Sequence, residues 1–424
     1  MKKHPFSPET EMMGYGYKPE LSEGAVKCPV FHTSTFVFKK AEDGKDYFAM
    51  AYGKDPDCQK PMGLIYSRLN NPDMEILEER LRLWDKGEAA AVFSSGMSAI
   101  STTMLTFLKP GDVILYSNPL YGGTHAFVTQ VLENFNIKAY PFNAGSGIED
   151  IIDIVENNNL AEKLKMIFIE TPANPTNDLI DIQMCAEVAK LYSDKHQQVL
   201  LAVDNTYMGP IWQHPLQHGA DIVVYSATKY IGGHSDLIAG AVVSTKELIG
   251  EIKRSRTFYG PIIDPHTCWL LMRSLETLKI RMEEASRNAH IIANHLKEHP
   301  KVEKVYYLGF THENNPDQAN VLYKQCLGYG AMLSFDIVGG EKEAFTFLNH
   351  LKHIKLAVSL GGTECLAEHP FSMTHADVPD EEKHALGISE KMIRLSVGIE
   401  YYKDIIWDID NAFKHVPMPK EEFA

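Results

Sequence analysis

Cysteine, long apolar runs and positive charge are all scarce in this chain of 424 residues. The six cysteines are scattered and form no C-x-x-C pair, which argues against a disulfide framework or a zinc site and is typical of reduced intracellular thiols. No stretch approaches the roughly 18 uninterrupted apolar residues of a membrane span, and no signal-peptide core follows the first lysines. We therefore expect a cytoplasmic protein with no membrane partner.

Acidic residues outnumber basic ones, with 56 Asp and Glu against 41 Lys and Arg, for a formal net charge of −15. Nucleic-acid-binding proteins usually carry a basic surface, so this balance predicts no nucleic-acid partner. Eighteen histidines invite a metal site, but no H-E-x-x-H or comparable ligand spacing appears, and we expect no metal. The content of 44% hydrophobic and 23% charged residues is typical of a soluble globular protein.

The chain divides into three parts by its sequence pattern. Residues 1–64 are rich in glycine, proline and polar residues and predict an extended N-terminal arm with little helix. In residues 65–280, strand-like runs alternate with helix-like segments, which predicts an α/β domain with a mostly parallel sheet covered by helices. A long helical stretch from about Pro265 to His299 leads into a smaller C-terminal α+β domain, residues 281–424. The expected strands are Ala89–Phe93, Asp112–Tyr116, Lys165–Glu170, Val199–Asp204, Ile222–Ser226, Lys304–Tyr307, Ala331–Ile337 and Met392–Ser396, and the expected helices include Met74–Trp84 and Ile182–Tyr192.

Lys229 is the most informative residue, because it follows an apolar run and comes directly after two hydroxyl side chains, Ser226 and Thr228. A lysine at the end of a buried strand loses hydration, which lowers its pKa and makes its amine a nucleophile or proton carrier near neutral pH. The hydroxyls suit a phosphate, so the segment suggests a Schiff base of Lys229 with pyridoxal 5'-phosphate (PLP). A bare S-x-T-K string more often marks an ordinary surface lysine after a strand, so the neighbouring segments must decide between a cofactor-binding lysine and a surface lysine.

Two of those segments offer the other partners that PLP needs. Asp204 ends a second apolar run, and a carboxylate at the end of a strand suits the protonated pyridine nitrogen. An ordinary helix cap is the alternative for Asp204. Residues 94–98 follow a strand candidate and open a helix, so the backbone N–H groups of Gly96 and Met97 are predicted to attract the phosphate. A helix start with a serine cap is the alternative there.

Several short motifs occur in a fixed order between about Gly24 and about Glu400. They are Tyr66-Ser67-Arg68-Leu69-Asn70-Asn71-Pro72, Ser94-Ser95-Gly96-Met97-Ser98-Ala99, Tyr121-Gly122-Gly123-Thr124, Glu170-Thr171-Pro172-Ala173-Asn174-Pro175, Val203-Asp204-Asn205-Thr206, Ser226-Ala227-Thr228-Lys229, Ser359-Leu360-Gly361-Gly362 and Arg394-Leu395-Ser396-Val397-Gly398-Ile399-Glu400. By these motifs the chain resembles the Cys/Met-metabolism PLP enzymes of fold type I. This family includes methionine γ-lyase, cystathionine γ-synthase, the cystathionine lyases and the O-acylhomoserine sulfhydrylases.

The resemblance implies a homodimer with shared active sites, with two such dimers pairing into a homotetramer. It implies that Tyr66 and Arg68 reach across the subunit interface to the partner's PLP phosphate, which the arginine fork would bind bidentately. It also implies that Tyr121 stacks on the cofactor with its hydroxyl near the γ position of the substrate, and that Asn174 binds the PLP 3'-oxygen. A surface loop is the alternative for Tyr66 and Arg68, and a buried tyrosine with an ordinary hydrogen bond is the alternative for Tyr121.

The resemblance further implies the chemistry of the site. Arg394 grips the substrate α-carboxylate with help from Ser359, Lys229 removes the Cα proton, and Tyr121 assists loss of the γ-substituent. The reaction ends either in a 2-oxo acid and ammonia, as in a lyase, or in addition of a thiol, as in a synthase. A catalytically silent scaffold on the same fold is a third possibility, although Lys229, Tyr121 and Arg394 are all present.

Two residues bear on the substrate, and they disagree. Val358 stands where cystathionine γ-synthases and γ-lyases usually carry a glutamate, and a valine offers no charge to a second ammonium group, so it favours a methionine-like substrate. Gly123 stands where typical methionine γ-lyases carry a reactive cysteine, and it resembles the cystathionine enzymes. We expect γ-elimination on a methionine-like amino acid, with γ-replacement as the alternative.

The segment Ala41–Gly63 is longer than the resemblance leads us to expect. It contains charged and aromatic residues, among them Asp46, Tyr52, Asp55 and Asp57. A solvated insertion loop is the expected structure. If the segment reaches a neighbouring site, a polar leaving group such as the hydroxyguanidine of canavanine becomes a real alternative to methanethiol.

Overall fold

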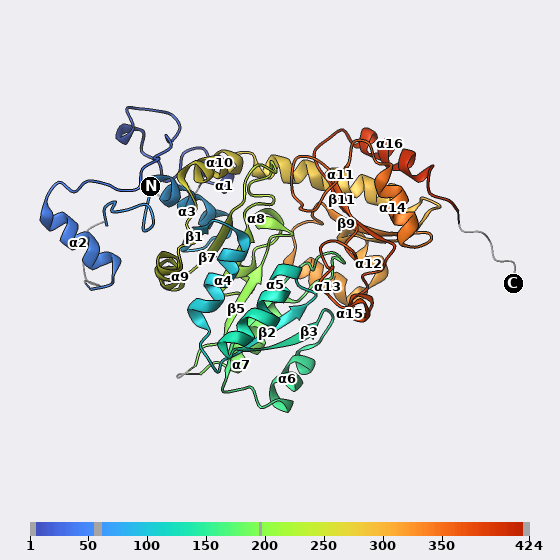
Figure 1. Ribbon diagram of the computed structural model, residues 1–424, viewed down its shortest axis with the longest axis horizontal. Coiled ribbons are helices and arrows are strands. Elements are labelled where there is room, and N and C mark those ends of the chain that lie inside the picture. Colours follow the sequence, from blue (N-terminus) through green and yellow to red (C-terminus); the bar gives the residue numbers. More distant parts are fainter. Residues whose placement is uncertain (1–5, 55–61, 195–196, 419–424) are drawn as a thin grey trace.

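The computed structural model describes residues 6–54, 62–194 and 197–418, which form two sheets with helices packed around them (Figure 1). The larger sheet has seven strands in the order β1-β7-β6-β5-β4-β2-β3. Strand β7 runs antiparallel to β1 and β6, and the other pairs are parallel, so the predicted mostly parallel sheet is confirmed. The strands are β1 (Ala89–Phe93), β2 (Val113–Asn118), β3 (Lys138–Asn143), β4 (Leu164–Glu170), β5 (Leu200–Asp204), β6 (Ile222–Ser226) and β7 (Gly240–Ser244).

Helices cover both faces of this sheet, which is why its central strands are apolar throughout. Successive side chains of β4 alternate between the faces: Phe168 joins one buried cluster, and Ile167 and Ile169 join another. The first cluster includes residues of α4 and α9, and the second includes residues of α6 and α7. The helices of this part are α3 (Pro72–Trp84), α4 (Gly96–Phe107), α5 (Gly122–Ala126), α6 (Ile148–Asn157), α7 (Ile182–Leu191), α8 (Gly209–Trp212), α9 (Lys246–Tyr259) and α10 (Pro265–Leu275).

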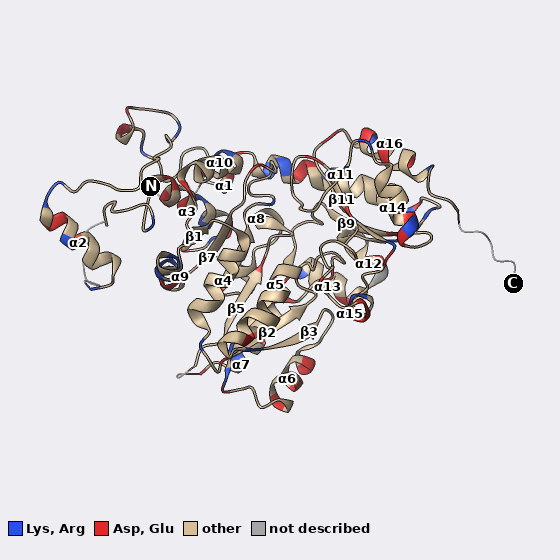
Figure 2. Ribbon diagram, viewed as in Figure 1, with Lys and Arg blue, Asp and Glu red and all other residues tan. Residues whose placement is uncertain are grey.

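The C-terminal part is built on a five-stranded sheet in the order β10-β11-β12-β9-β8. Its strands are β8 (Val302–Tyr306), β9 (Met332–Ile337), β10 (Lys355–Leu356), β11 (Leu366–Glu368) and β12 (Met392–Ser396), and its helices are α11 (Leu278–Lys297), α12 (Thr311–Asn314), α13 (Pro316–Gln325), α14 (Glu341–Asn349), α15 (Asp380–Ala385) and α16 (Tyr402–Phe413). Charged residues gather on outer helices such as α6 and α15 (Figure 2). The division of the chain at residues 64 and 280 stays a prediction.

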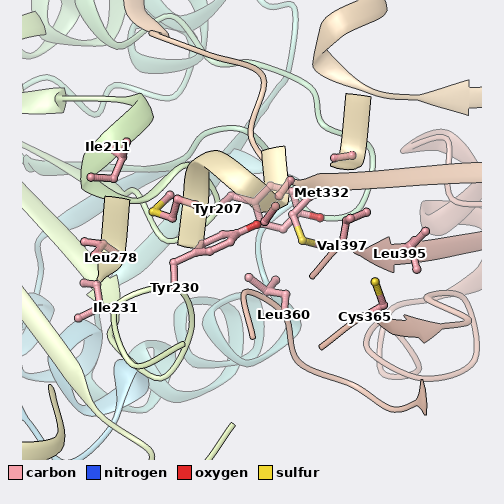
Figure 3. Close-up of a cluster of buried hydrophobic side chains, with 14 of the residues drawn as sticks. Tyr207, Ile211, Tyr230, Ile231, Leu278, Met332, Leu360, Cys365, Leu395 and Val397 are labelled. Carbon is pink, nitrogen blue, oxygen red and sulfur yellow. The ribbon is translucent and has the colours of Figure 1, made fainter. Parts of the chain in front are cut away.

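One apolar core joins the two parts (Figure 3). Tyr207 and Tyr230, which follow β5 and β6 of the larger sheet, lie in the same buried cluster as Met332 of β9 and Leu395 of β12. Leu360, from the loop after β10, belongs to this cluster too. The shared core fixes the C-terminal sheet against the ends of β5 and β6, where the sequence predicts the functional residues.

The arm contains a helix that the sequence pattern did not predict, α2 (Ala41–Ala51), so the expected loop is wrong for this stretch. Figure 1 shows α2 far from both sheets. Its stabilising contacts are local: the rings of Phe38 and Tyr47 meet edge to face at 6.0 Å, and acidic residues occupy its first turn. Because few of its side chains are buried, the sequence of α2 has only a weak helical spacing of apolar residues. Asp55, Asp57 and Cys58 lie outside the described residues.

Two further predictions need correction. The long helical stretch is two helices, α10 and α11, because the backbone leaves the helical conformation at Thr277. Strands β3, β7, β10 and β11 were not expected. Strand β3 is a half-exposed edge strand containing Pro141, and β10 and β11 have only two and three residues. Strand β7 is fully buried and was missed, although it is as long as β1, β5 and β6. Among the described residues, no helix has both the length and the apolar content needed to span a membrane.

Strand β7 packs so closely on the start of α4 that its first residue must be glycine. A Cβ at Gly240 would overlap the Ser95 carbonyl oxygen, whereas a Cβ at Gly250, within α9, would meet nothing within 4 Å. We expect Gly240→Ala to lower the free energy of unfolding by roughly 1–3 kcal/mol through overpacking. Gly250→Ala should raise it by up to about 1 kcal/mol through better helix propensity. Thermal melting of both variants checks this, and equal melting temperatures would contradict the packing at Gly240.

Candidate active site

A cavity of about 300 Å³ opens at the carboxyl ends of β4, β5 and β6. The last residues of these parallel strands, Glu170, Asp204 and Ser226, all line it, as expected where strand ends meet at one edge of a sheet. The cavity brings together most of the site residues predicted from the sequence. Those in its wall are Gly96, Met97, Tyr121, Asn174, Asp204, Ser226, Thr228 and Lys229.

One end of the cavity is suited to an anion. Helix α4 begins at Gly96, and its cap, Ser95, accepts a hydrogen bond from the Ser98 backbone N–H at 3.0 Å. A Cβ on Gly96 would come within 2.8 Å of the Ser226 Cβ, so only glycine lets the helix start this close to β6. The Thr228 hydroxyl accepts from the Ala239 N–H at 3.0 Å. Helix N–H groups and hydroxyls therefore converge at this end.

Lys229 is largely buried, and its Nζ donates to the Ser359 Oγ at 2.8 Å. The pKa of the lysine is lowered from 10.5 to about 8, mainly by burial and also by the nearby Arg394 cation, while the Glu368 carboxylate acts in the opposite direction. A substantial fraction of the amine is therefore unprotonated at neutral to mildly alkaline pH. Such an amine can form a covalent bond to a carbonyl carbon or accept a proton.

Two buried carboxylates face the cavity from neighbouring strands, because Glu170 of β4 and Asp204 of β5 are register partners. Burial and the Asp204 charge raise the pKa of Glu170 to about 8, and burial also raises the pKa of Asp204. Glu170 accepts the Tyr121 backbone N–H at 2.7 Å, so it holds the loop that carries Tyr121. A cationic group in the cavity would find its counter-charge here.

Sequence reasoning did not single out Glu170 as a site residue. The available signal was its place as a carboxylate at the end of a buried strand, the same signal that identified Asp204.

Arg394, on β12, lies behind the cavity wall and is only 3% exposed. Its Nη1 donates to the Asn174 Oδ1 at 3.1 Å, and its Nη2 donates to the Ser359 carbonyl oxygen at 2.8 Å. The Asn174 oxygen also accepts from the Tyr207 hydroxyl at 3.2 Å, which leaves the Asn174 amide N–H groups for another acceptor. Ser359, at φ +95°, thus contacts both Lys229 and Arg394.

Three predicted residues lie outside this arrangement in the described part of a single chain. Tyr66 is 42% exposed, and Arg68 donates to the Thr257 carbonyl oxygen at 2.8 Å, and neither lines the cavity. Val358 is 55% exposed and also lies outside the lining, although it is next to Ser359 in the chain. The fold of one chain therefore does not bring Tyr66 or Arg68 to Lys229.

The lowered pKa of Lys229 has a direct chemical consequence. Only the neutral amine reacts with acetic anhydride, so acetylation of Lys229 in cofactor-free protein should rise with pH and level off above a midpoint near pH 8. Peptide mass spectrometry after short pulses measures this, with N-acetyl-lysine methyl ester as the unburied reference. A Lys229 profile that follows the reference amine up to pH 10 and beyond would refute the shift.

Comparison with known proteins agrees with this geometry. A family model described as Cys/Met metabolism PLP-dependent enzyme matches residues 9–414. An L-methionine gamma-lyase of Fusobacterium nucleatum is 39% identical over 395 residues, covering 93% of this chain and 94% of that protein. A cystathionine gamma-lyase of Bacillus subtilis is 38% identical over 409 residues, covering 96% of this chain and 99% of that protein. Among solved structures, this chain is similar to a cystathionine gamma synthase from Xanthomonas oryzae pv. oryzae in complex with aminoacrylate and cysteine. The TM-score is 0.86 at 31% sequence identity, and the match covers 97% of this chain and 99% of that chain. The chain belongs to the Cys/Met-metabolism family of PLP-dependent enzymes.

Proposed function

We propose that this enzyme catalyses γ-elimination on a methionine-like amino acid, giving a 2-oxo acid, ammonia and the γ leaving group. The observation that carries the proposal is the position of Ser359 between Lys229 and Arg394. Its hydroxyl accepts from the lysine amine, and its carbonyl accepts from the guanidinium. Lys229 as a base and Arg394 as a receptor for the α-carboxylate therefore lie on either side of Ser359. Proton removal from the Cα of an amino acid needs a base and a carboxylate-binding group held close together in this way.

The donors and acceptors of the cavity fit PLP, the cofactor of this family. The carboxylate of Asp204 suits the ring nitrogen, the amide of Asn174 suits the 3'-oxygen, and Tyr121 lines the cavity where its ring can stack. The phosphate would be held by the backbone N–H groups of Gly96 and Met97 and by the hydroxyls of Ser226 and Thr228. When bound, the protonated ring withdraws electrons from the substrate Cα and makes its proton removable.

The residues of this chain then divide the remaining work. Arg394 binds the α-carboxylate and orients the Cα–H bond toward Lys229. The Lys229 amine, whose pKa burial lowers so that part of it is unprotonated near neutral pH, takes the Cα proton and then moves protons at Cβ. The Tyr121 hydroxyl donates a proton to the departing group at the γ position. Family membership also argues against the silent-scaffold alternative.

Substrate choice rests on the rim of the site. Val358 is exposed and uncharged, and the cavity wall includes the apolar side chains of Leu360 and Ile238, which a thioether can contact. The arm segment 41–54, with its charged and aromatic residues, keeps canavanine and its polar leaving group among the substrates to test.

A second candidate is γ-replacement, as in a cystathionine γ-synthase or an O-acylhomoserine sulfhydrylase, and Gly123 favours it. A Cβ at Gly123 would come within 2.8 Å of the Tyr121 Cε1. The cysteine of a typical methionine γ-lyase would therefore displace the Tyr121 ring from the position it takes here.

The deciding experiment supplies the PLP-loaded enzyme with methionine, canavanine, cystathionine or O-acylhomoserine, with and without cysteine. We expect 2-oxobutyrate from methionine, or homoserine and hydroxyguanidine from canavanine, without any thiol. Turnover of O-acylhomoserine alone, diverted to cystathionine by cysteine, would replace the lyase proposal with the synthase. Val358→Glu is the matched variant: it should raise kcat/KM for cystathionine relative to methionine by roughly tenfold or more, since the distal ammonium group of cystathionine gains a carboxylate partner.

We also propose that Tyr66 and Arg68 complete the site of a partner subunit, since they lie outside the cavity of their own chain. The proposed assembly is a homodimer, and two dimers form a homotetramer. Arg68→Ala and Lys229→Ala proteins, each inactive, should regain up to about a quarter of wild-type activity when co-refolded, because a mixed dimer has one intact site. Refolding each variant alone is the control. An inactive mixture, despite mixed dimers on native mass spectrometry, would contradict the shared site.

A further inference from the structure

Glu368 is a buried carboxylate that the proposed mechanism does not use. It ends β11, lies directly opposite Arg394 of β12 in the antiparallel ladder, and is 0% exposed. Its Oε1 lies 2.7 Å from the Arg394 Nη1 and also accepts from the Thr374 hydroxyl at 3.0 Å. Opposed residues of neighbouring strands stand side by side, so the ion pair is set by the sheet register itself.

The hydrogen bonds of Arg394 show which part of the guanidinium is left for a substrate. Nη1 donates a hydrogen bond to Asn174 and forms the ion pair with Glu368, and Nη2 donates one hydrogen bond to the Ser359 carbonyl. The Arg394 Nε is buried and has no hydrogen-bond partner among the described residues. The Nε hydrogen and the second Nη2 hydrogen remain, and these are the donors that bind a carboxylate side-on.

We propose that Glu368 is the positioning residue for substrate binding, holding Arg394 so that its Nε and Nη2 edge receives the α-carboxylate of the amino acid. This inference rests on the proposed function, because it assumes that Arg394 binds the substrate. The partner of a ligand-binding side chain sets its orientation in the same way as the outer shell of a metal site does.

The other hydrogen bonds of Arg394 go to neutral groups, the Asn174 amide oxygen and the Ser359 carbonyl. Without Glu368, the guanidinium would therefore be a buried cation with no partner of opposite charge among these contacts. The Glu368 carboxylate supplies that charge from the neighbouring strand and holds Nη1 at the sheet.

Norleucine and pentylamine separate this role from general damage. Norleucine has no γ leaving group, and pentylamine is the same molecule without the carboxylate. The readout is the concentration of each that half-saturates the absorbance change of the PLP-loaded enzyme. We expect Glu368→Gln to raise the value for norleucine by roughly 10- to 100-fold, the usual effect of losing such an orienting partner. The value for pentylamine should change far less, because the charge of Glu368 reaches this ligand only through its effect on Lys229. Glu368→Asp should restore part of the norleucine affinity.

Asp336→Asn is the matched control. This buried carboxylate of β9 lies in the same sheet but accepts from two hydroxyls, those of Tyr306 and Ser389, instead of a guanidinium. This variant should leave the half-saturating concentrations of norleucine and pentylamine unchanged. If Glu368→Gln does not fold, Thr374→Val replaces it, because loss of its hydrogen bond to Glu368 should weaken norleucine binding in the same direction.

The outcomes separate this inference from the proposed function. If Glu368→Gln weakens the binding of norleucine and pentylamine equally, or makes norleucine bind more tightly, the positioning role is overturned. Arg394→Lys tests the underlying proposal: if it leaves norleucine binding intact, Arg394 is not the carboxylate receptor and the proposed function loses its support. If Arg394→Lys weakens norleucine selectively and Glu368→Gln does not, only the inference about Glu368 fails.

Discussion

The site depends on the apolar core that the two sheets share. Tyr207 and Tyr230, from the loops after β5 and β6, and Leu395 of β12 belong to one buried cluster (Figure 3). Because protein cores are close-packed, this contact leaves little freedom to the residues beside it. Lys229 and Ser359, 130 residues apart, therefore meet at 2.8 Å, and Arg394 comes within reach of Asn174. A substitution that loosened this core would therefore separate the Lys229 amine from the Arg394 guanidinium, even with every site residue intact.

Burial then sets the chemistry through the balance of charges. The cavity and its back wall hold two cations, Lys229 and Arg394, and three carboxylates, Glu170, Asp204 and Glu368, all largely removed from water. Desolvation disfavours every charged form, so the pKa of Lys229 falls and the pKa values of the carboxylates rise. The Arg394–Glu368 pair offsets part of this cost within the sheet. The charge of Asp204 disfavours a second charge on Glu170 beside it, so the carboxyl pair suits a single cationic group such as a protonated ring.

Local sequence patterns anticipated much of this. Strands β1, β4, β5 and β6 are buried on both faces, so each appears as an apolar run, and the polar residues that end such runs mark the edge of the sheet where ligands bind. Lys229 and Asp204 were found in this way. The patterns missed elements where burial is partial: β3 is a half-exposed edge strand and α2 lies apart from both sheets, so neither has a strong apolar period. They also missed the buried strand β7. Glu170 ends a buried strand as Asp204 does, but only the register of β4 on β5 shows that the two carboxylates are neighbours.

The sequence by itself determined the fold class, the cofactor and most residues of the cavity. Apolar runs marked the buried strands and the polar residues that end them, whereas Tyr121 and Asn174 were identified through motifs that resemble those of the family. Only the tertiary structure decided which of these residues meet. The pairing of Glu368 with Arg394 follows from the register of β11 on β12, and the contact of Lys229 with Ser359 follows from the packing of one sheet against the other. Register and packing are set by long-range contacts, which no local period records. The position of Tyr66 and Arg68 outside the cavity of their own chain, which the family resemblance had implied, is likewise visible only in the tertiary structure.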